Sequence, residues 1–486
     1  MEMIKEQSTK SNFIFQVIYQ ILIWVAPLVI SPYLTRHLGS EPLGTYTYVN
    51  SIAYYFLIFA NLGIAKYGQR AIAEVKNDSI ELRKCFWSLY INHFITAVIS
   101  LVFYMFFVMW FVQEDRSIYY ISGLYVLSAL FDISWLFYGL ENFKSVAIKN
   151  AVVKIIDMLC IFMFVKEPSD LWKYTLISCV STLFSQIVLI PQAVKNIKII
   201  KVSLTDIFKH TKPLLLLFIS VIAITLYTIF DKTLLGILST KENVAYYEYA
   251  NRIINIPKQF IGIISTILFP KICFLVNNNR IKESRKYLSV SVTITSMLAF
   301  ASIFGIISVA DEFALIYYGK SFAETGKIMA CMSPLIYILT LGDTIRLQYM
   351  IPNHKDRAYI TCACCNALLN LILSTLLIPK WGVYGAITGT MGAEIFGLLF
   401  QIIYSRKFVP IKLIIGKGIP FFSIGLIMFI ALKLLDNVIF GVSVSLLIIK
   451  IIIGVFVYIS NVMIYVLYIS KDRLLYRDFI RNKIKL

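Results

Sequence analysis

One apolar run near the middle of the chain carries a stripe of polar side chains. The stripe recurs at i, i+4, i+7 and i+11 and consists of Glu248, Arg252, Asn255 and Gln259. On a helix this spacing places the four side chains within roughly 60° of one another. Asn251 and Lys258 flank the stripe. A carboxylate, two cations and several amides on one helical face predict a site for a charged, hydrogen-bonding ligand.

Two interpretations of this stripe remain open. A charged side chain inside an apolar span costs about 2.5–3.5 kcal/mol on insertion scales, so the stripe must face protein or a watery cavity. It either lines an aqueous cleft between two halves of the molecule, or Glu248 and Arg252 form an internal pair that joins helices. The corresponding face of the run at 45–65 has Thr47, Asn50 and Ser51, which are polar but uncharged.

Other ionisable residues lie in apolar runs and fall into two groups. Lys154 with Asp157 and Asp343 with Arg346 are i,i+3 pairs, for which a salt bridge and a functional role are equally good interpretations. A carboxylate without a partner favours binding a proton or another cation. The carboxylates that we consider for ion coupling are Asp132, Asp157, Asp231, Asp343 and Glu394.

The composition indicates which elements must position these residues. Of 486 residues, 59% are hydrophobic and 15% are charged, whereas soluble domains carry about 25% charged residues. About fourteen runs are long enough to cross ~30 Å of hydrocarbon as helices. The sequence therefore predicts an all-α integral membrane protein with spans at 13–34, 45–65, 86–112, 118–138, 146–165, 172–194, 213–238, 244–270, 287–310, 326–345, 358–378, 382–404, 414–435 and 442–469.

The net charge of +19 is distributed in a way that predicts topology rather than nucleic-acid binding. Of the 46 lysines and arginines, 32 fall at the predicted cytoplasmic ends and loops and 10 at the outside ones. This alternation follows the positive-inside rule and places both termini in the cytoplasm. We therefore expect a multi-pass protein of a bacterial plasma membrane and no nucleic-acid partner.

A basic segment divides the chain into two similar halves. The segment is KNIKIIKVSLTDIFKHTK at 195–212, and Tyr46-x-Tyr48-x-Asn50 before it matches Tyr247-x-Tyr249-x-Asn251 after it. The predicted organisation is a six-helix lobe at 1–194, a cytoplasmic linker at 195–212, a second six-helix lobe at 213–410, and two extra helices with a basic tail at 411–486. With even helix numbers the lobes form a parallel repeat, a known plan of transporters.

Metal and enzyme chemistry have little support in the sequence. Cys362 and Cys365 have C-x-x-C spacing, but no second pair and no nearby histidine cluster, so we expect no metal or other cofactor. The longest outside loop, DEFALIYYGKSFAET, has no histidine and no evident acid/base pair. The sequence thus predicts no catalytic residue and no enzyme.

Several motifs resemble those of a known family of transporters. They are PLVISPYLTRHLGSEPLGTYTYVNSIAYYF at 27–56, LGIAKYGQRAIA at 62–73, FDISWLFYGLENFK at 131–144, DKTLLG at 231–236, and the Tyr-x-Tyr-x-Asn-Arg stretch that leads to Phe269-Pro270. In this order and spacing they resemble polysaccharide flippases of the Wzx (RfbX) type. These flippases belong to the MOP (multidrug/oligosaccharidyl-lipid/polysaccharide) exporter superfamily, with the MATE drug exporters and the lipid II flippase.

The resemblance implies two six-helix lobes around a central cavity, with two further helices. It also implies translocation of undecaprenyl-diphosphate-linked oligosaccharide from the cytoplasmic to the outer leaflet for capsule, O-antigen or exopolysaccharide assembly, by alternating access. The expected driving force is either a proton or sodium gradient or the removal of product outside. Membrane lipids are the expected partners, together with a polysaccharide polymerase and chain-length machinery. The alternative is a MATE-like, cation-coupled antiporter of drugs or other solutes.

A diphosphate head group requires cations in a wet cleft. The residues proposed for it are Arg252, Lys258, Lys154 and Arg346. Sugars require hydrogen bonds and aromatic faces, for which the candidates are Glu248, Asn251, Asn255, Gln259, Tyr46, Tyr48 and Asn50.

Overall fold

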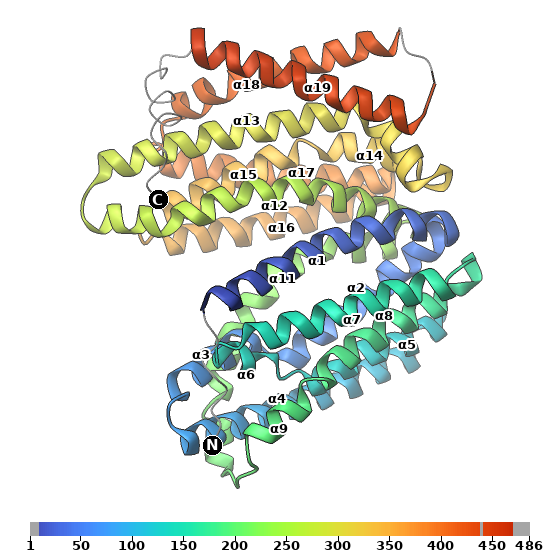
Figure 1. Cartoon of the computed structure of the whole chain (residues 1–486), viewed down its shortest axis with the longest axis vertical. Helices are drawn as coiled ribbons and strands as arrows, with labels where there is room; N and C mark the ends of the chain where they lie inside the picture. Colours follow the sequence, from blue (N-terminus) through green and yellow to red (C-terminus); the bar gives the residue numbers. More distant parts are fainter. Residues whose placement is uncertain (1–8, 438–440, 470–486) are drawn as a thin grey trace. The chain divides into compact units, whose positions relative to one another are not determined.

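The computed structural model describes residues 9–437 and 441–469, and this part of the chain is helical throughout, without a strand. The chain divides into two compact units, Met1–Ala245 and Tyr246–Leu486. Figure 1 shows the helices of each unit. The prediction of an all-α membrane protein is confirmed.

The first unit contains eleven helices among its described residues. Most are long, and short helices mark the loops and the linker. Their bounds are α1 (Thr9–His37), α2 (Ser40–Asn61), α3 (Ile64–Val75), α4 (Ser79–Phe111), α5 (Arg116–Leu127), α6 (Ser134–Gly139), α7 (Phe143–Phe164), α8 (Leu171–Ile187), α9 (Ile190–Asn196), α10 (Leu204–Phe208) and α11 (Thr211–Leu238).

The second unit begins within α12 and ends with the C-terminal pair α18 and α19, which pack on each other and on α13. Its helices are α12 (Lys241–Asn277), α13 (Ile281–Phe313), α14 (Glu324–Met332), α15 (Leu335–Ile345), α16 (Asp356–Trp381), α17 (Val383–Ser405), α18 (Ile411–Asp436) and α19 (Val444–Ile464). Two π-helical turns, η3 (Ala314–Tyr318) and η5 (Arg346–Met350), follow α13 and α15.

Eleven helical segments of the described chain are long and apolar enough to cross a membrane. A twelfth is the pair Lys320–Met332 and Leu335–Met350, which is bent by 43° at its break. The two other predicted spans coincide with α7 and α11, which are not among these segments. Helix α7 carries four charged side chains, Lys144, Lys149, Lys154 and Asp157. The number of fourteen spans and the parallel repeat therefore stay predictions.

The fourth predicted span is not one continuous helix. A 3₁₀ turn, η1 (Ser128–Phe131), separates α5 from α6, and Asp132 follows it. The backbone N–H and the hydroxyl of Ser134 both donate to Asp132 Oδ1, at 2.9 and 2.6 Å. Trp135 is buried against Gly68 of α3, where a Cβ atom would lie 2.7 Å from the indole ring. A carboxylate that accepts local hydrogen bonds and a bulky ring that fits only against glycine stabilise this break.

The linker at 195–212 is folded against α4. The Ser203 hydroxyl donates to Asp206 at 2.6 Å, and Lys84 of α4 lies 3.0 Å from the same carboxylate. These two interactions lower the pKa of Asp206 from 3.8 to about 2. The Trp87 indole N–H donates to the Lys198 carbonyl at 3.2 Å. The polar linker is thus an ordered part of the first unit.

Helix α11 packs with the first unit as well, against α2 and α3. The hydroxyls of Tyr55 on α2 and Thr233 on α11 are 2.9 Å apart. Along the chain, the boundary between the compact units therefore falls after α11. The repeat in the sequence instead places this helix at the start of the second lobe. The predicted lobe boundaries describe the repeat and stay a prediction.

Small residues bring α16 and α17 into close contact. A Cβ atom on Gly385 would lie 2.4 Å from the Leu377 backbone, and one on Gly389 would lie 2.4 Å from the Ser374 hydroxyl. Small residues at these positions let the two helix backbones approach closely, as is common between helices in membranes.

Candidate functional site

The stripe on α12 contains an ion pair. Arg252 Nε donates to Glu248 Oε1 at 2.9 Å, so the internal pair expected from the i,i+4 spacing is formed. The pair is not sealed, because 28% of the Arg252 side chain and 13% of the Glu248 side chain remain exposed. One partner of this cation is therefore a carboxylate of its own helix, and part of the Arg252 side chain stays exposed.

An aromatic cluster surrounds one side of Arg252. Its guanidinium lies over the Tyr249 ring, 4.5 Å from the centroid. The Tyr318 hydroxyl, from the π-helical turn after α13, donates to the Tyr249 carbonyl at 3.0 Å, and both rings are buried. Gly319 follows with φ 93°, a conformation that favours glycine, and it lets the loop turn back onto α12. This support of Arg252 was not predicted, because Tyr318 is 69 residues from Tyr249 in sequence.

The next cation on α12 belongs to a second group. Lys258 is half-buried and lies within electrostatic range of Asp343 on α15. Asp343 is also 2.8 Å from Arg346. The structure thus brings together three residues that the sequence offered separately, from α12 and from the end of α15. The amides Asn251 and Asn255 are half-buried, and Gln259 is exposed.

In the first unit the predicted pair on α7 is formed. Lys154 Nζ donates to Asp157 Oδ2 at 2.8 Å, and Asp157 is almost fully buried. Among the described residues nothing hydrogen-bonds to Asp157 Oδ1. Tyr46 of α2 lies within electrostatic range of Asp157, and its ring stands 4.5 Å from that of Tyr174. Lys154, Asp157 and Tyr46 therefore form one local group.

The two other predicted sugar contacts on α2, Tyr48 and Asn50, have different surroundings from Tyr46. The Lys241 ammonium lies 3.7 Å from the centroid of the Tyr48 ring. The same ring packs against Gly236, where a Cβ atom would lie 2.0 Å from it. Asn50 is half-buried. The Tyr48 ring is thus engaged in packing between α2 and α11.

The remaining coupling candidates have different surroundings. Asp132 caps the break before α6, as described above. Asp231 is buried on α11, within electrostatic range of Tyr55. Glu394 is half-buried on α17, and among the described residues no hydrogen bond or ion pair involves its carboxylate. Glu394 is thus the carboxylate whose setting best fits the partnerless group expected from sequence.

Two buried lysines were not singled out in the sequence. Lys149 on α7 donates to the Ser185 carbonyl at 2.5 Å and to Gln186 Oε1 at 3.3 Å. Lys450 on α19 donates to Glu312 of α13 and, at 2.5 Å, to Asp436 of α18. The Lys450 partners are 138 and 14 residues away along the chain, so no local spacing could have revealed the cluster.

Known proteins similar to the chain are transporters. The family model "Polysaccharide biosynthesis protein" matches residues 9–275, and the model "Lipid II flippase MurJ" matches residues 175–467. Proteins described as "Putative O-antigen transporter" are 23% identical over 383 residues in Shigella dysenteriae and 22% identical over 405 residues in Escherichia coli (strain K12). These alignments cover 78% and 82% of this chain, and 95% and 97% of the relatives.

A solved structure shares the fold. It is "Lipid II flippase MurJ, inward closed conformation", with a TM-score of 0.75 and 19% identity over 97% of this chain and all of that one. The fold likeness therefore extends over the whole chain, including the C-terminal helix pair. Each of the two family models spans more than half of the sequence. The chain therefore belongs to the polysaccharide biosynthesis protein family, as a Wzx-type member of the MOP exporter superfamily.

Proposed function

We propose that the protein is a flippase for undecaprenyl-diphosphate-linked oligosaccharide. It moves repeat units from the cytoplasmic to the outer leaflet of the bacterial plasma membrane for surface polysaccharide assembly. The observation that carries this proposal is the overlap of two family models, one for polysaccharide biosynthesis and one for a lipid II flippase, which together span residues 9–467. Both descriptions concern sugars that are assembled at membranes.

The cations on α12 support a role in binding the head group. A diphosphate that enters the membrane needs charge-assisted hydrogen bonds, and guanidinium groups bind phosphate in a bidentate manner. Arg252 donates its Nε–H to Glu248 and 28% of its side chain is exposed, so a phosphate can approach this cation while the pair stays intact. Lys258 lies six residues farther along the same helix. Lys154 and Arg346 are assigned the same role; each is likewise paired with a carboxylate, at 2.8 Å.

The carboxylates beside these cations reduce the free-energy cost of burying the cations when no substrate is bound. An unpaired cation would be expensive in a low-dielectric region, whereas a paired one is tolerated. The diphosphate then adds to, or replaces, the carboxylate as the partner of the cation. Alternating access follows if the substrate-bound and empty states favour different arrangements of the helices. The oligosaccharide contacts Asn251, Asn255 and Gln259 on the same helix as Arg252.

Coupling to a proton or sodium gradient is part of the proposal. Glu394 is the best-supported coupling residue, because its half-buried carboxylate has no partner among the described residues. Asp231 and Asp157 are further candidates, both buried. Fourteen crossings, with α7 and α11 added to the twelve apolar segments, place both termini in the cytoplasm, as the charge bias predicts. A polymerase and chain-length machinery on the outer side are the proposed partners.

A depletion experiment with lipid extraction tests this function. Removal of the protein should cause a diphosphate-linked oligosaccharide to accumulate at the cytoplasmic face, with loss of surface polymer. Accumulation of single repeat units on the outer face would assign the protein to polymerisation instead. Unchanged lipid-linked sugars together with altered sensitivity to cationic drugs would support the antiporter and overturn the proposal.

A further inference from the structure

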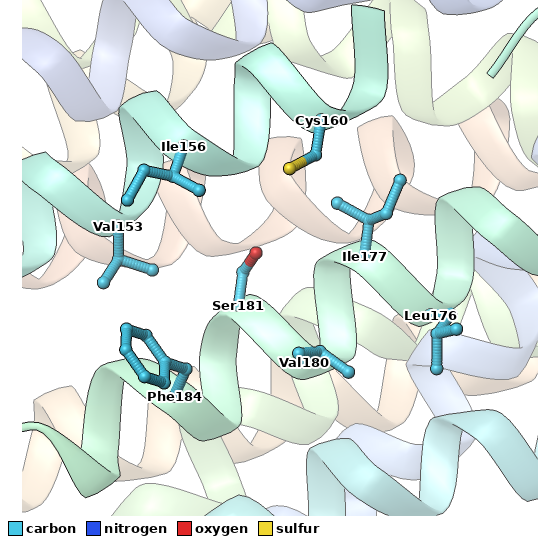
Figure 2. A pocket seen from close by; sticks show the side chains of 8 residues that line it. All are labelled: Val153, Ile156, Cys160, Leu176, Ile177, Val180, Ser181 and Phe184. Carbon is cyan, nitrogen blue, oxygen red and sulfur yellow. The ribbon is translucent and has the colours of Figure 1, made fainter. Parts of the chain in front are cut away.

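A groove lies between α7 and α8 of the first unit, on a different side of α7 from Lys154. The two helices are neighbours joined by a short turn, and the groove between them has a volume of about 270 Å³. Figure 2 shows Val153, Ile156 and Cys160 of α7 facing Ile177, Ser181 and Phe184 of α8. Ile156 and Phe184 are about half exposed, so the groove opens to the outside of the unit, which in a membrane is lipid.

A buried lysine, Lys149, precedes the groove residue Val153 by one turn of α7. Lys149, Val153, Ile156 and Cys160 are spaced at i, i+4, i+7 and i+11, so on α7 they form one stripe within about 60°. Lys149 is 7% exposed, and its contacts are with Ser185 and Gln186, immediately after the groove residue Phe184 on α8. An apolar groove with a cation one helical turn away has the shape and polarity that fit a lipid chain with an anionic head.

The charge of Lys149 is not balanced by an ion pair. Its two partners, a backbone carbonyl and an amide oxygen, are neutral. Among the described residues no carboxylate forms a salt bridge with it, and Asp132 acts on it only through longer-range electrostatics. The ammonium has three protons and two acceptors here, so one donor can bind a further acceptor. A buried ammonium without a counter-ion is unfavourable in a membrane unless an anion joins it.

We infer that the α7/α8 groove binds one acyl chain of an anionic glycerophospholipid whose phosphate contacts Lys149. In the proposed topology α7 begins at the cytoplasmic side, so Lys149 lies near the head groups of the inner leaflet, where basic pockets between helices bind anionic lipids. The second acyl chain stays in the bilayer.

The same geometry separates this lipid from the transported substrate. On α7, Lys154 points about 140° away from Lys149, because the two residues are five positions apart. The Lys154–Asp157 pair is grouped with Tyr46 of α2, whereas Lys149 faces α8. One head group therefore does not reach both lysines through the groove. The inference depends on the proposed topology but not on transport.

A simpler interpretation is that Lys149 only caps the C-terminal end of α8. Its contact with the Ser185 carbonyl lies in the last turn of that helix, which ends at Ile187, and a cation there is favourable. That interpretation explains the contact but predicts no dependence of lipid binding on Lys149 or on the groove. The two accounts therefore differ in a measurable way.

The test is native mass spectrometry of the full chain in detergent, titrated with phosphatidylglycerol and, separately, with phosphatidylcholine. Wild type should bind a first phosphatidylglycerol more tightly than phosphatidylcholine. Lys149→Gln should weaken that first step roughly tenfold or more, the effect of losing a charge-assisted hydrogen bond. Ser181→Phe fills the groove and should weaken it while Lys149 remains in place.

Two further variants serve as controls. Lys149→Arg keeps the charge and should keep the binding. Lys195→Gln removes an exposed charge on α9, outside the groove, and should leave binding unchanged. Wild-type binding by both Lys149→Gln and Ser181→Phe, or equal binding of the two phospholipids, would overturn the inference. Displacement of phosphatidylglycerol by equimolar undecaprenyl phosphate would also overturn it, and would assign the groove to the substrate carrier. If Lys149→Gln unfolds, the other two variants test the inference: Ser181→Phe should weaken phosphatidylglycerol binding and Lys149→Arg should keep it.

Discussion

The two units contain buried cations that differ in their partners. In the second unit Lys450 of α19 contacts two carboxylates, Glu312 and Asp436, from two other helices. In the first unit Lys149 contacts only neutral oxygens. Both lysines are more than nine-tenths buried. Equal burial with unequal charge balance indicates different roles for the two sites.

Arg252 lies between these extremes. It pairs with Glu248, a carboxylate of its own helix, and its side chain remains partly exposed. A cation with two carboxylates is satisfied and holds helices together, whereas a cation with one or none can still accept an anion. The comparison therefore predicts that Lys450 stabilises the fold, that Arg252 serves transport, and that Lys149 serves lipid binding.

The largest effect is expected for Lys450→Met. This change leaves Glu312 without its cation and Asp436 with only the half-exposed Lys433. Breaking a buried ion pair destabilises by about 3–5 kcal/mol. The midpoint of thermal unfolding in detergent should fall, and membrane abundance should fall with it. Lys433→Met is the matched control, because Lys433 contacts the same Asp436 but is half exposed. If the midpoint of thermal unfolding of Lys450→Met equals that of wild type, the cluster has no structural role.

The double variant Arg252→Ala/Lys258→Ala should abolish export at normal membrane abundance. The head group then loses two charge-assisted contacts, each worth about 1.5–3 kcal/mol. Surface polymer and extracted lipid-linked oligosaccharide give the readout. Lys271→Ala, an exposed lysine on the same helix, is the control. Normal export from the double variant would contradict the head-group assignment.

The sequence was sufficient for the class of fold and for contacts within one helix. Apolar runs predicted the helices, and i,i+3 or i,i+4 spacing predicted Lys154–Asp157, Asp343–Arg346 and Glu248–Arg252. It was insufficient for the break at Asp132. This break depends on Ser134 and on the fit of Trp135 against Gly68, and hydropathy carries no information about such local packing.

Contacts between helices could also not be predicted from the sequence. The Lys450 cluster joins α13, α18 and α19, and Tyr318 supports Arg252 from a distant turn. The roles of Lys149 and its groove depend on which face of α7 meets α8. A single sequence contains the residues of such sites but not the packing that assembles them.

A smaller effect on stability is expected for Lys149→Met. This change removes a buried charge and leaves no charge behind, so it costs only the hydrogen bonds to Ser185 and Gln186, about 1 kcal/mol or less. Thermal unfolding measured beside Lys450→Met gives the comparison directly. A loss as large as that of Lys450→Met would mean that Lys149 is a structural residue and that the two lysines are equivalent.

The smallest effect is expected at the exposed Lys84–Asp206 bridge of the linker. Asp206→Asn should speed hydrogen exchange slightly in 203–210 and change nothing else. Because the pKa of Asp206 is lowered from 3.8 to about 2, the carboxylate is ionised at pH 5 and at pH 8. The difference from wild type should therefore be the same at both values and should shrink only as the pH falls toward about 2. A difference that vanishes at pH 5 would contradict the lowered pKa.

The most direct test of the central claim is a flipping assay in proteoliposomes. The purified chain is reconstituted with a fluorescent undecaprenyl-diphosphate oligosaccharide, and an impermeant reductant reports the fraction that remains in the outer leaflet. We predict protein-dependent movement across the bilayer that Arg252→Ala/Lys258→Ala loses and Lys271→Ala retains. No movement with the wild-type chain, while the same vesicles exchange a cationic drug for protons or sodium, would contradict the flippase and favour the antiporter.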